Sequence, residues 1–440
     1  MNLKMNLKNK MDVERTNVSK TDVLFPPLPP RIKVEFSRPF WNIMSILGLY
    51  LTPNLDKRLH VEFKKIYPDD KIIFVDSATS GIYLILKELD VSKKDEIIIP
   101  SYVCKAVINA VLEAGATPVF VDISDDFNMD PKDIVKKITS KTRAIIAVHQ
   151  YGKLCQIKEI RKICKNYNKK HKIILIEDTA VPIGIQSGDV QSGLFGDYSV
   201  FSFNMGKTIV SFGGGAVLSK STFNLNNLNN ISKKRGKHML RRYLFFLTNI
   251  YYKKFFSMPF NLLRELGFAH REENIQQLYE KSNARPVKIV PTTMTRLQKA
   301  ATLHQLRNID IITKNLKRIA GIYDTLLKNI KEIRLPDSKF NQYTYYAIKI
   351  SDGSDDSSRY ELATFLSKVG IETQWTFYPL HLQSKYSRYY TKNDSLKNTN
   401  LLWKRELSLP IGPKMSEKKA RFVANQISEF YICKHRIVRK

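Results

Sequence analysis

Residues 172–207 read KIILIEDTAVPIGIQSGDVQSGLFGDYSVFSFNMGK and contain the features that decide the fold. Two apolar, β-branched runs, 172–178 and 198–203, lack the alternation of a half-buried strand, which is typical of strands buried on both faces. The first run ends on Asp178, and the loop after the second contains Lys207. Open parallel sheets bind ligands at such strand ends, so this stretch predicts a site as well as a sheet.

The same pattern extends toward the N-terminus from this stretch. Four more short apolar runs alternate with helical stretches, at 72–75, 96–100, 117–123 and 143–149. Buried strands separated by helices predict a mostly parallel sheet with helices on both faces. We therefore expect a large α/β domain over residues 61–290.

The flanking segments differ in character. The polar composition of residues 1–22 predicts a disordered leader. Residues 23–60 are expected to form an N-terminal arm with an apolar segment. Within the large domain, 222–290 reads as an apolar and basic insertion. Residues 291–440 predict a smaller C-terminal α+β domain in the order strand, helix, strand, helix. Its second strand is expected at the end of RYELATFLSKVGIETQWTF, residues 359–377.

Composition limits the compartment and the partners. The 440 residues carry a net charge of +31 but no long Lys/Arg block, which argues against a nucleic-acid tail. Four cysteines without CxxC spacing predict reduced thiols in a cytoplasmic protein and no metal site. No apolar run is long enough to span a bilayer. Two interpretations stay open for the apolar segments 40–51 and 240–266: peripheral contact with an anionic membrane, or packing on each other or on a second subunit.

A lysine, a buried aspartate and a helix start follow one another in an order that suits pyridoxal phosphate. Lys207 could form a Schiff base, and Asp178 could keep the pyridine nitrogen protonated. Small residues at 77–79 mark a strand-to-helix junction, where backbone N–H groups could bind the phosphate. Each residue alone is weak evidence, whereas the set predicts the cofactor.

Over residues 60–430 the chain resembles the DegT/StrS-type sugar aminotransferases, which are fold-type I pyridoxal-phosphate enzymes with a seven-stranded sheet. The resemblance implies that Lys207 binds the cofactor covalently and carries the proton, that Asp178 pairs with the pyridinium, and that Ser202 binds the phosphate with Ala78 and Thr79. It implies a homodimer that moves an amino group, usually from glutamate, to a nucleotide-linked keto sugar in surface-glycan or amino-sugar biosynthesis. The segments that carry it include DSATSG, EIIIPSYVCKAV, TPVFVDI, AVHQYG, LIEDTA, SFNMGK, FGGGAVL, MTRLQ and FYPLH.

Some positions depart from the family pattern. Cys104 stands where the aromatic residue that stacks on the cofactor is expected, with Tyr102 nearby. Val181 replaces a residue that contacts the cofactor's phenolic oxygen. The residues PTT at 291–293 replace an asparagine motif that reaches a neighbouring subunit's site.

The resemblance also points to three residues whose roles the sequence leaves open. Tyr378 and His381 of FYPLH are expected beside the substrate, although a hydrogen-bonded core or turn histidine explains His381 equally well. His149 either lies over the cofactor edge or is a buried histidine bonded to backbone.

Two other functions stay open. One is a pyridoxal-phosphate sugar dehydratase, although relatives of that kind carry histidine in place of Lys207. The other is a non-catalytic, membrane-associated member of the same fold, suggested by Val181, Cys104 and PTT.

Overall fold

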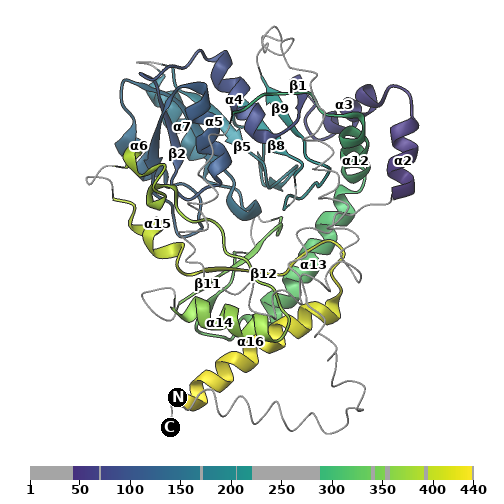
Figure 1. The fold of residues 1–440 in the computed structure, drawn as a ribbon, viewed down its shortest axis with the longest axis vertical. Coiled ribbons are helices and arrows are strands. Elements are labelled where there is room, and N and C mark those ends of the chain that lie inside the picture. Colours follow the sequence, from purple (N-terminus) through teal and green to yellow (C-terminus); the bar gives the residue numbers. More distant parts are fainter. Residues whose placement is uncertain are drawn as a thin grey trace.

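A computed structural model describes residues 43–68, 71–168, 172–204, 206–220, 288–337, 342–351, 357–390 and 395–438. The predicted leader and most of the insertion at 222–290, including the segment 240–266, lie outside the described residues. The large sheet-containing part occupies the upper half of Figure 1, and α13 leads from it to a smaller part below.

A seven-stranded sheet forms the centre of the large part, in the order β1-β9-β8-β5-β4-β2-β3. β9 runs antiparallel to both of its neighbours, and the remaining pairs are parallel. This confirms the predicted mostly parallel sheet. Its strands are β1 (Lys71–Val75), β2 (Glu96–Pro100), β3 (Thr117–Val121), β4 (Thr142–Val148), β5 (Ile174–Asp178), β8 (Tyr198–Ser202) and β9 (Gly215–Ser219).

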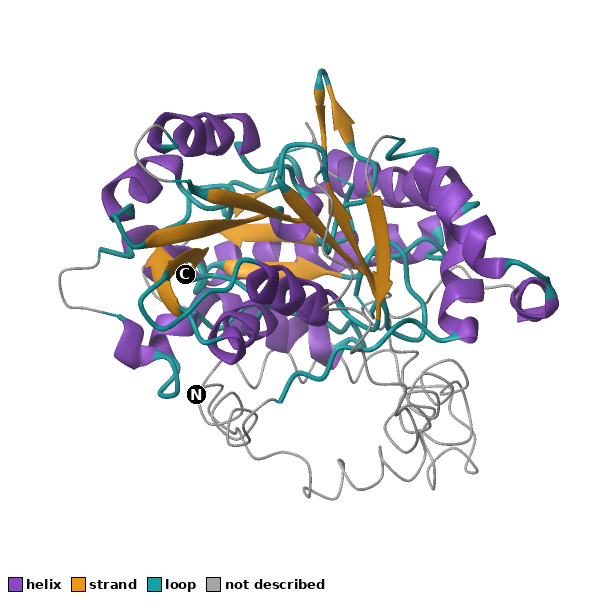
Figure 2. Ribbon diagram, turned by 90° about the horizontal axis from the view of Figure 1, so that it is seen from above, coloured by secondary structure: helices purple, strands orange, loops and turns teal. Residues whose placement is uncertain are grey.

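Helices cover both faces of this sheet (Figure 2). Successive residues of β2 show the division, because Ile97 and Ile99 belong to one apolar cluster and Ile98 to another. The helices on one face are α4 (Ala78–Glu88) and α5 (Lys105–Ala114). The helices on the other face are α6 (Pro131–Lys137), α7 (Ile157–Tyr167), α3 (Leu55–Lys64) and α12 (Arg296–Leu306). Burial on both sides explains why these strands are continuous apolar runs.

Helix α2 (Ile43–Leu51) lies in the apolar arm segment and packs against α12. Ser45 Oγ lies 3.1 Å from His304 Nδ1, and the guanidinium of Arg296 donates to the carbonyl of Tyr50 at 2.6 Å. The opposite face of α2 is open, with Met44 77% and Leu51 78% exposed. Among the described residues, the helices are too short or too polar to cross a bilayer.

The smaller part contains an antiparallel sheet in the order β10-β11-β12. Its elements are β10 (Ile333–Arg334), β11 (Tyr346–Ile350), β12 (Glu406–Leu409), α13 (Ile309–Leu327), α14 (Ser357–Lys368), α15 (Lys397–Leu402) and α16 (Glu417–Val438). The strand expected at the end of 359–377 is absent, and only an isolated bridge joins Gln374 to Ser408 there. β12 takes the place beside β11 because all four of its residues are buried, whereas 372–377 are only half-buried.

Short elements complete the fold. They are the hairpin of β6 (Gln186–Ser187) and β7 (Val190–Gln191) and the 3-10 turns η3 (Gln150–Gly152), η4 (Leu380–Leu382) and η5 (Ser387–Tyr389). η3 directly follows β4, so it lies at the same edge of the sheet as the ends of β5 and β8.

Candidate functional site

A cavity opens at the carboxyl ends of the parallel strands, where the polar residues of the sequence pattern were expected. Six of the eight predicted site residues line it: Ala78, Thr79, Cys104, Asp178, Ser202 and Lys207. These residues come from the starts of α4 and α5, the ends of β5 and β8, and the loop after β8. The fold thus brings together groups that are up to 129 positions apart in the sequence, from 78 to 207.

The N-terminus of α4 forms one end of the cavity. Ser77 precedes the helix in an extended conformation, and its Oγ accepts the N–H of Ser80 at 3.1 Å. In the described part of the chain the N–H of Thr79 has no hydrogen-bond partner, whereas the N–H of Ala78 faces Gly214 in the bridge from Ser77. Free N–H groups and the positive end of the helix dipole together bind anions such as phosphate.

The glycine run before β9 lets that strand pass close to the start of α4. A Cβ on Gly215 would lie 2.6 Å from the carbonyl oxygen of Phe201 and 2.8 Å from the nitrogen of Ala78. Gly214 has a φ of +112°, which disfavours other residues. Thr292 of the PTT segment supports the same junction, because its carbonyl accepts the N–H of Asp76 at 2.8 Å.

Asp178 is a buried carboxyl group at the end of β5. It is 5% exposed, and its Oδ1 accepts the N–H of Ala180 at 2.9 Å. Burial raises the pKa of Asp178 above its ordinary value, and the positive charge of Lys207 opposes that rise. A carboxylate in such a place is stabilised by a cation bound next to it.

The loop that carries Lys207 is fixed to the end of β5. Thr208, the next residue, donates its hydroxyl to the carbonyl of Val181 at 2.7 Å. Val181 itself lines the cavity and offers it an apolar side chain. The amine and the carboxyl group are therefore held at neighbouring strand ends.

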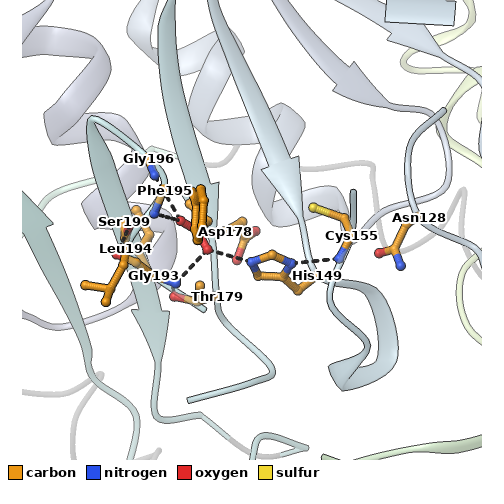
Figure 3. A network of polar contacts seen from close by, with 12 residues as sticks. Asn128, His149, Cys155, Asp178, Thr179, Gly193, Leu194, Phe195, Gly196 and Ser199 are labelled. Carbon is orange, nitrogen blue, oxygen red and sulfur yellow. Dashed lines mark hydrogen bonds and ion pairs between the residues drawn. The ribbon is translucent and has the colours of Figure 1, made fainter. Parts of the chain in front are cut away.

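His149, which lines the cavity, forms a buried polar network with Glu177; Figure 3 labels His149 and the loop residues that take part. Glu177 accepts hydrogen bonds from the N–H groups of Gly193 and Gly196 and from His149 Nε2, the last at 2.7 Å. His149 Nδ1 lies 3.0 Å from the backbone nitrogen of Cys155, so both ring nitrogens have partners. These donors hold the pKa of Glu177 below its ordinary value although burial acts to raise it. The histidine lines the cavity and is also tied to backbone and carboxylate.

Sequence reasoning did not find the aromatic side chains that line the cavity. They are Tyr151, Tyr345 and Phe377. Tyr102 is turned away, and its hydroxyl bonds that of Tyr151 at 2.7 Å. Two of the three lining rings come from the C-terminal part: Phe377 begins the FYPLH segment that the resemblance placed at the site, whereas no local pattern marks Tyr345.

Tyr378 and His381, which were expected beside the substrate, are not among the residues that line the cavity. His381 is 3% exposed, with Nδ1 2.6 Å from Ser101 Oγ and Nε2 3.0 Å from Asn400 Oδ1. Tyr378 packs edge-on against Trp403. Both ring nitrogens of His381 are thus used by the fold, as in a hydrogen-bonded core histidine.

Comparison with known proteins decides the family. The model of the DegT/DnrJ/EryC1/StrS aminotransferase family matches residues 49–428. The chain belongs to this family. This aminotransferase is 29% identical over 358 residues to the GDP-perosamine synthase of Escherichia coli O157:H7, covering 81% of the chain and 85% of the relative. It is 28% identical to the GDP-perosamine synthase of Vibrio cholerae, covering 86% and 90%.

Solved structures show the same fold. Helicobacter pylori PseC is described as an aminotransferase involved in the biosynthesis of pseudoaminic acid. It superposes on this chain with a TM-score of 0.71 at 19% identity, covering 90% of this chain and 99% of that one. A second structure is described as the putative sugar aminotransferase Spr1654 of Streptococcus pneumoniae in its PLP form. Its TM-score is 0.68 at 20% identity, covering 92% of this chain and 98% of that one. The fold is therefore fold-type I, as predicted.

The cofactor of this aminotransferase is pyridoxal phosphate, and the residues of the cavity fit it. An amine, a buried carboxyl group and a helix start line one cavity. The amine complements the aldehyde of the cofactor, the carboxyl group its pyridinium, and the helix start its phosphate. When bound, the cofactor supplies a ring that takes up electrons from the substrate.

Proposed function

We propose that this aminotransferase moves an amino group from glutamate to a keto sugar carried on a nucleotide, in the biosynthesis of an amino sugar or surface glycan. The observation that carries the proposal is the common cavity of Lys207 and Asp178. The names of the relatives give the substrate class, since they include two GDP-perosamine synthases and a dTDP-3-amino-3,6-dideoxy-α-D-galactopyranose transaminase of Aneurinibacillus thermoaerophilus.

Each lining group has a proposed task. The amine of Lys207 holds the cofactor and moves the proton between the two carbons that exchange the amino group. The carboxylate of Asp178 keeps the ring nitrogen protonated. The start of α4, at Ala78 and Thr79, binds the phosphate together with the hydroxyl of Ser202. Cys104 and Val181 contribute apolar walls, and the rings of Tyr345 and Phe377 help exclude water.

We also propose that the enzyme is a cytoplasmic homodimer. Its four cysteines are free thiols, as expected in a reducing compartment. The exposed apolar side chains of α2 suit a subunit interface, among them Leu47 at 46% and Leu51 at 78%. Light scattering should give twice the chain mass, and Leu51→Ser should weaken the dimer. Flotation of the wild-type protein with anionic vesicles, at the mass of a monomer, would instead favour peripheral membrane binding.

The reaction is tested with purified protein and pyridoxal phosphate. Glutamate and a panel of GDP- and dTDP-linked 4-keto sugars should give 2-oxoglutarate and an amino sugar in equal amounts. Lys207→Ala should abolish both products, whereas Lys162→Ala, an exposed lysine on α7, should not. Loss of water from the sugar without amino transfer would identify a dehydratase. Cofactor binding without either reaction would indicate a non-catalytic member.

A further inference from the structure

Gln150 has a buried amide that the fold does not use. The residue is 4% exposed and lines the cavity, and its Nε2 has no hydrogen-bond partner in the described part of the chain. Leaving a buried amide donor unpaired is costly, and such groups are rare in folded proteins. An unpaired donor on a residue that lines a cavity indicates that a ligand supplies its acceptor.

The backbone of Gln150 is held firmly, so the side chain has a defined origin. Its N–H donates to Asn128 Oδ1 at 2.8 Å, and its carbonyl accepts the N–H of Lys153 at 2.9 Å. Tyr151, the next residue, takes a φ of +57°. The turn η3 therefore stands in a fixed position above the end of β4.

The strand order gives Gln150 its position relative to the other lining groups. β5, which ends on Asp178, lies between β8 and β4. Ser202 ends β8, and the start of α4 lies on that same side, because Ser77 bridges to Gly214 next to β9. Val148 pairs with Asp178, so Gln150 follows directly on the opposite side. The phosphate-binding groups and Gln150 thus flank Asp178 from two sides.

Pyridoxal phosphate has a matching arrangement of groups. The ring nitrogen lies opposite the carbon that bears the aldehyde, and that carbon is flanked on one side by the phosphate arm and on the other by the ring hydroxyl. With the nitrogen at Asp178 and the phosphate at α4, the hydroxyl falls on the β4 side. Val181, at the end of β5, lines the cavity without a donor.

We propose that Gln150 donates a hydrogen bond from Nε2 to the ring hydroxyl oxygen of the cofactor. This inference rests on the proposed function, because it takes the cofactor's orientation from the tasks assigned to Asp178 and α4. A donor at this oxygen stabilises its negative charge. Gln150 is thereby a cofactor-binding residue that sets the charge state of the bound ring.

The test compares wild type with Gln150→Leu, which keeps the size and removes the donor, and Gln150→Glu, which replaces it with an acceptor. Gln156→Leu, at an exposed position, is the matched control. Equilibrium dialysis of the cofactor-free proteins measures the Kd for pyridoxal phosphate and for 3-deoxypyridoxal phosphate, which lacks the ring hydroxyl. A pH titration of the visible absorption band follows the charge state of the bound cofactor, and circular dichroism checks folding.

Gln150→Leu should weaken pyridoxal phosphate binding about tenfold or more, because it removes a hydrogen bond to a charged oxygen. For the same reason, the midpoint of the pH titration of the absorption band should rise by about one pH unit. Gln150→Glu should move it further. For 3-deoxypyridoxal phosphate, the Kd values of wild type and Gln150→Leu should agree.

Two results would overturn this inference alone: a Gln150→Leu variant that matches wild type in both measurements, or one that weakens the two compounds equally. Wild-type protein that binds neither compound would overturn the proposed function itself, and the inference with it.

Discussion

Glu177 and His149 form a fully buried pair, with His149 Nε2 2.7 Å from Glu177 Oε1 and both side chains 0% exposed. The pair joins the ends of β4 and β5 to the loop 193–196, where the N–H groups of Gly193, Phe195 and Gly196 donate to the same carboxylate (Figure 3). β5 ends on Asp178 and β4 leads into Gln150, and both residues line the cavity. The network therefore helps to position these two residues.

Glu177→Gln is expected to lower the free energy of unfolding by about 3 kcal/mol. The amide NH2 replaces a carboxylate oxygen that accepts hydrogen bonds, so it faces buried N–H donors and leaves them without an acceptor. Denaturant titration measures this change. Asp189→Asn, which removes an exposed ion pair with Lys158, should cost far less, because water and salt screen such a pair. Equal losses in the two variants would contradict the role of the network.

Asp178→Asn should stabilise the cofactor-free protein and weaken the holoenzyme. The pKa of Asp178 is raised by burial, so its contribution to stability is complete below the ordinary aspartate pKa and declines as pH rises through the folded value. Melting of the cofactor-free proteins should therefore favour Asp178→Asn at neutral pH and show little difference in acid. Pyridoxal phosphate should bind the variant at least about tenfold more weakly. A variant less stable than wild type without cofactor, at neutral pH, would count against this account.

Glu406 predicts a second dependence on pH. Its carboxyl group is fully buried, and burial raises its pKa to about 8, although Ser408 and the N–H of Thr376 donate to it. The stability it contributes is complete below the ordinary glutamate pKa and is lost as pH rises through about 8. Glu406→Gln cannot ionise, so its free energy of unfolding should fall less than that of wild type between about pH 6 and pH 9. Denaturation curves that stay parallel over this range would refute the assignment.

Much of the fold followed from local pattern. β5 and β9 are buried along their whole length, and continuous apolar runs are what such strands require. Asp178 could be found because a charged residue that ends a buried strand needs a partner, and Lys207 because it lies in the loop after another buried strand.

What the sequence did not indicate depends on contacts between distant segments. Residues 371–377 have strand-like composition, yet β12 pairs with β11 because its own four residues are buried more completely. The sequence left two interpretations of His381 open, and no local pattern indicates that its two ring nitrogens meet Ser101 and Asn400. Phe377 reaches the cavity from beyond the large sheet, and no period in the sequence reports such a return.

The central claim is that Lys207 holds the cofactor, and reduction with borohydride tests it most directly. Wild-type protein incubated with pyridoxal phosphate, reduced, digested and analysed by mass spectrometry should carry the cofactor's mass on the peptide that contains Lys207. Lys162→Ala should give the same labelled peptide, and Lys207→Ala should lose the label. A label on another lysine, or none in wild type, would contradict the account.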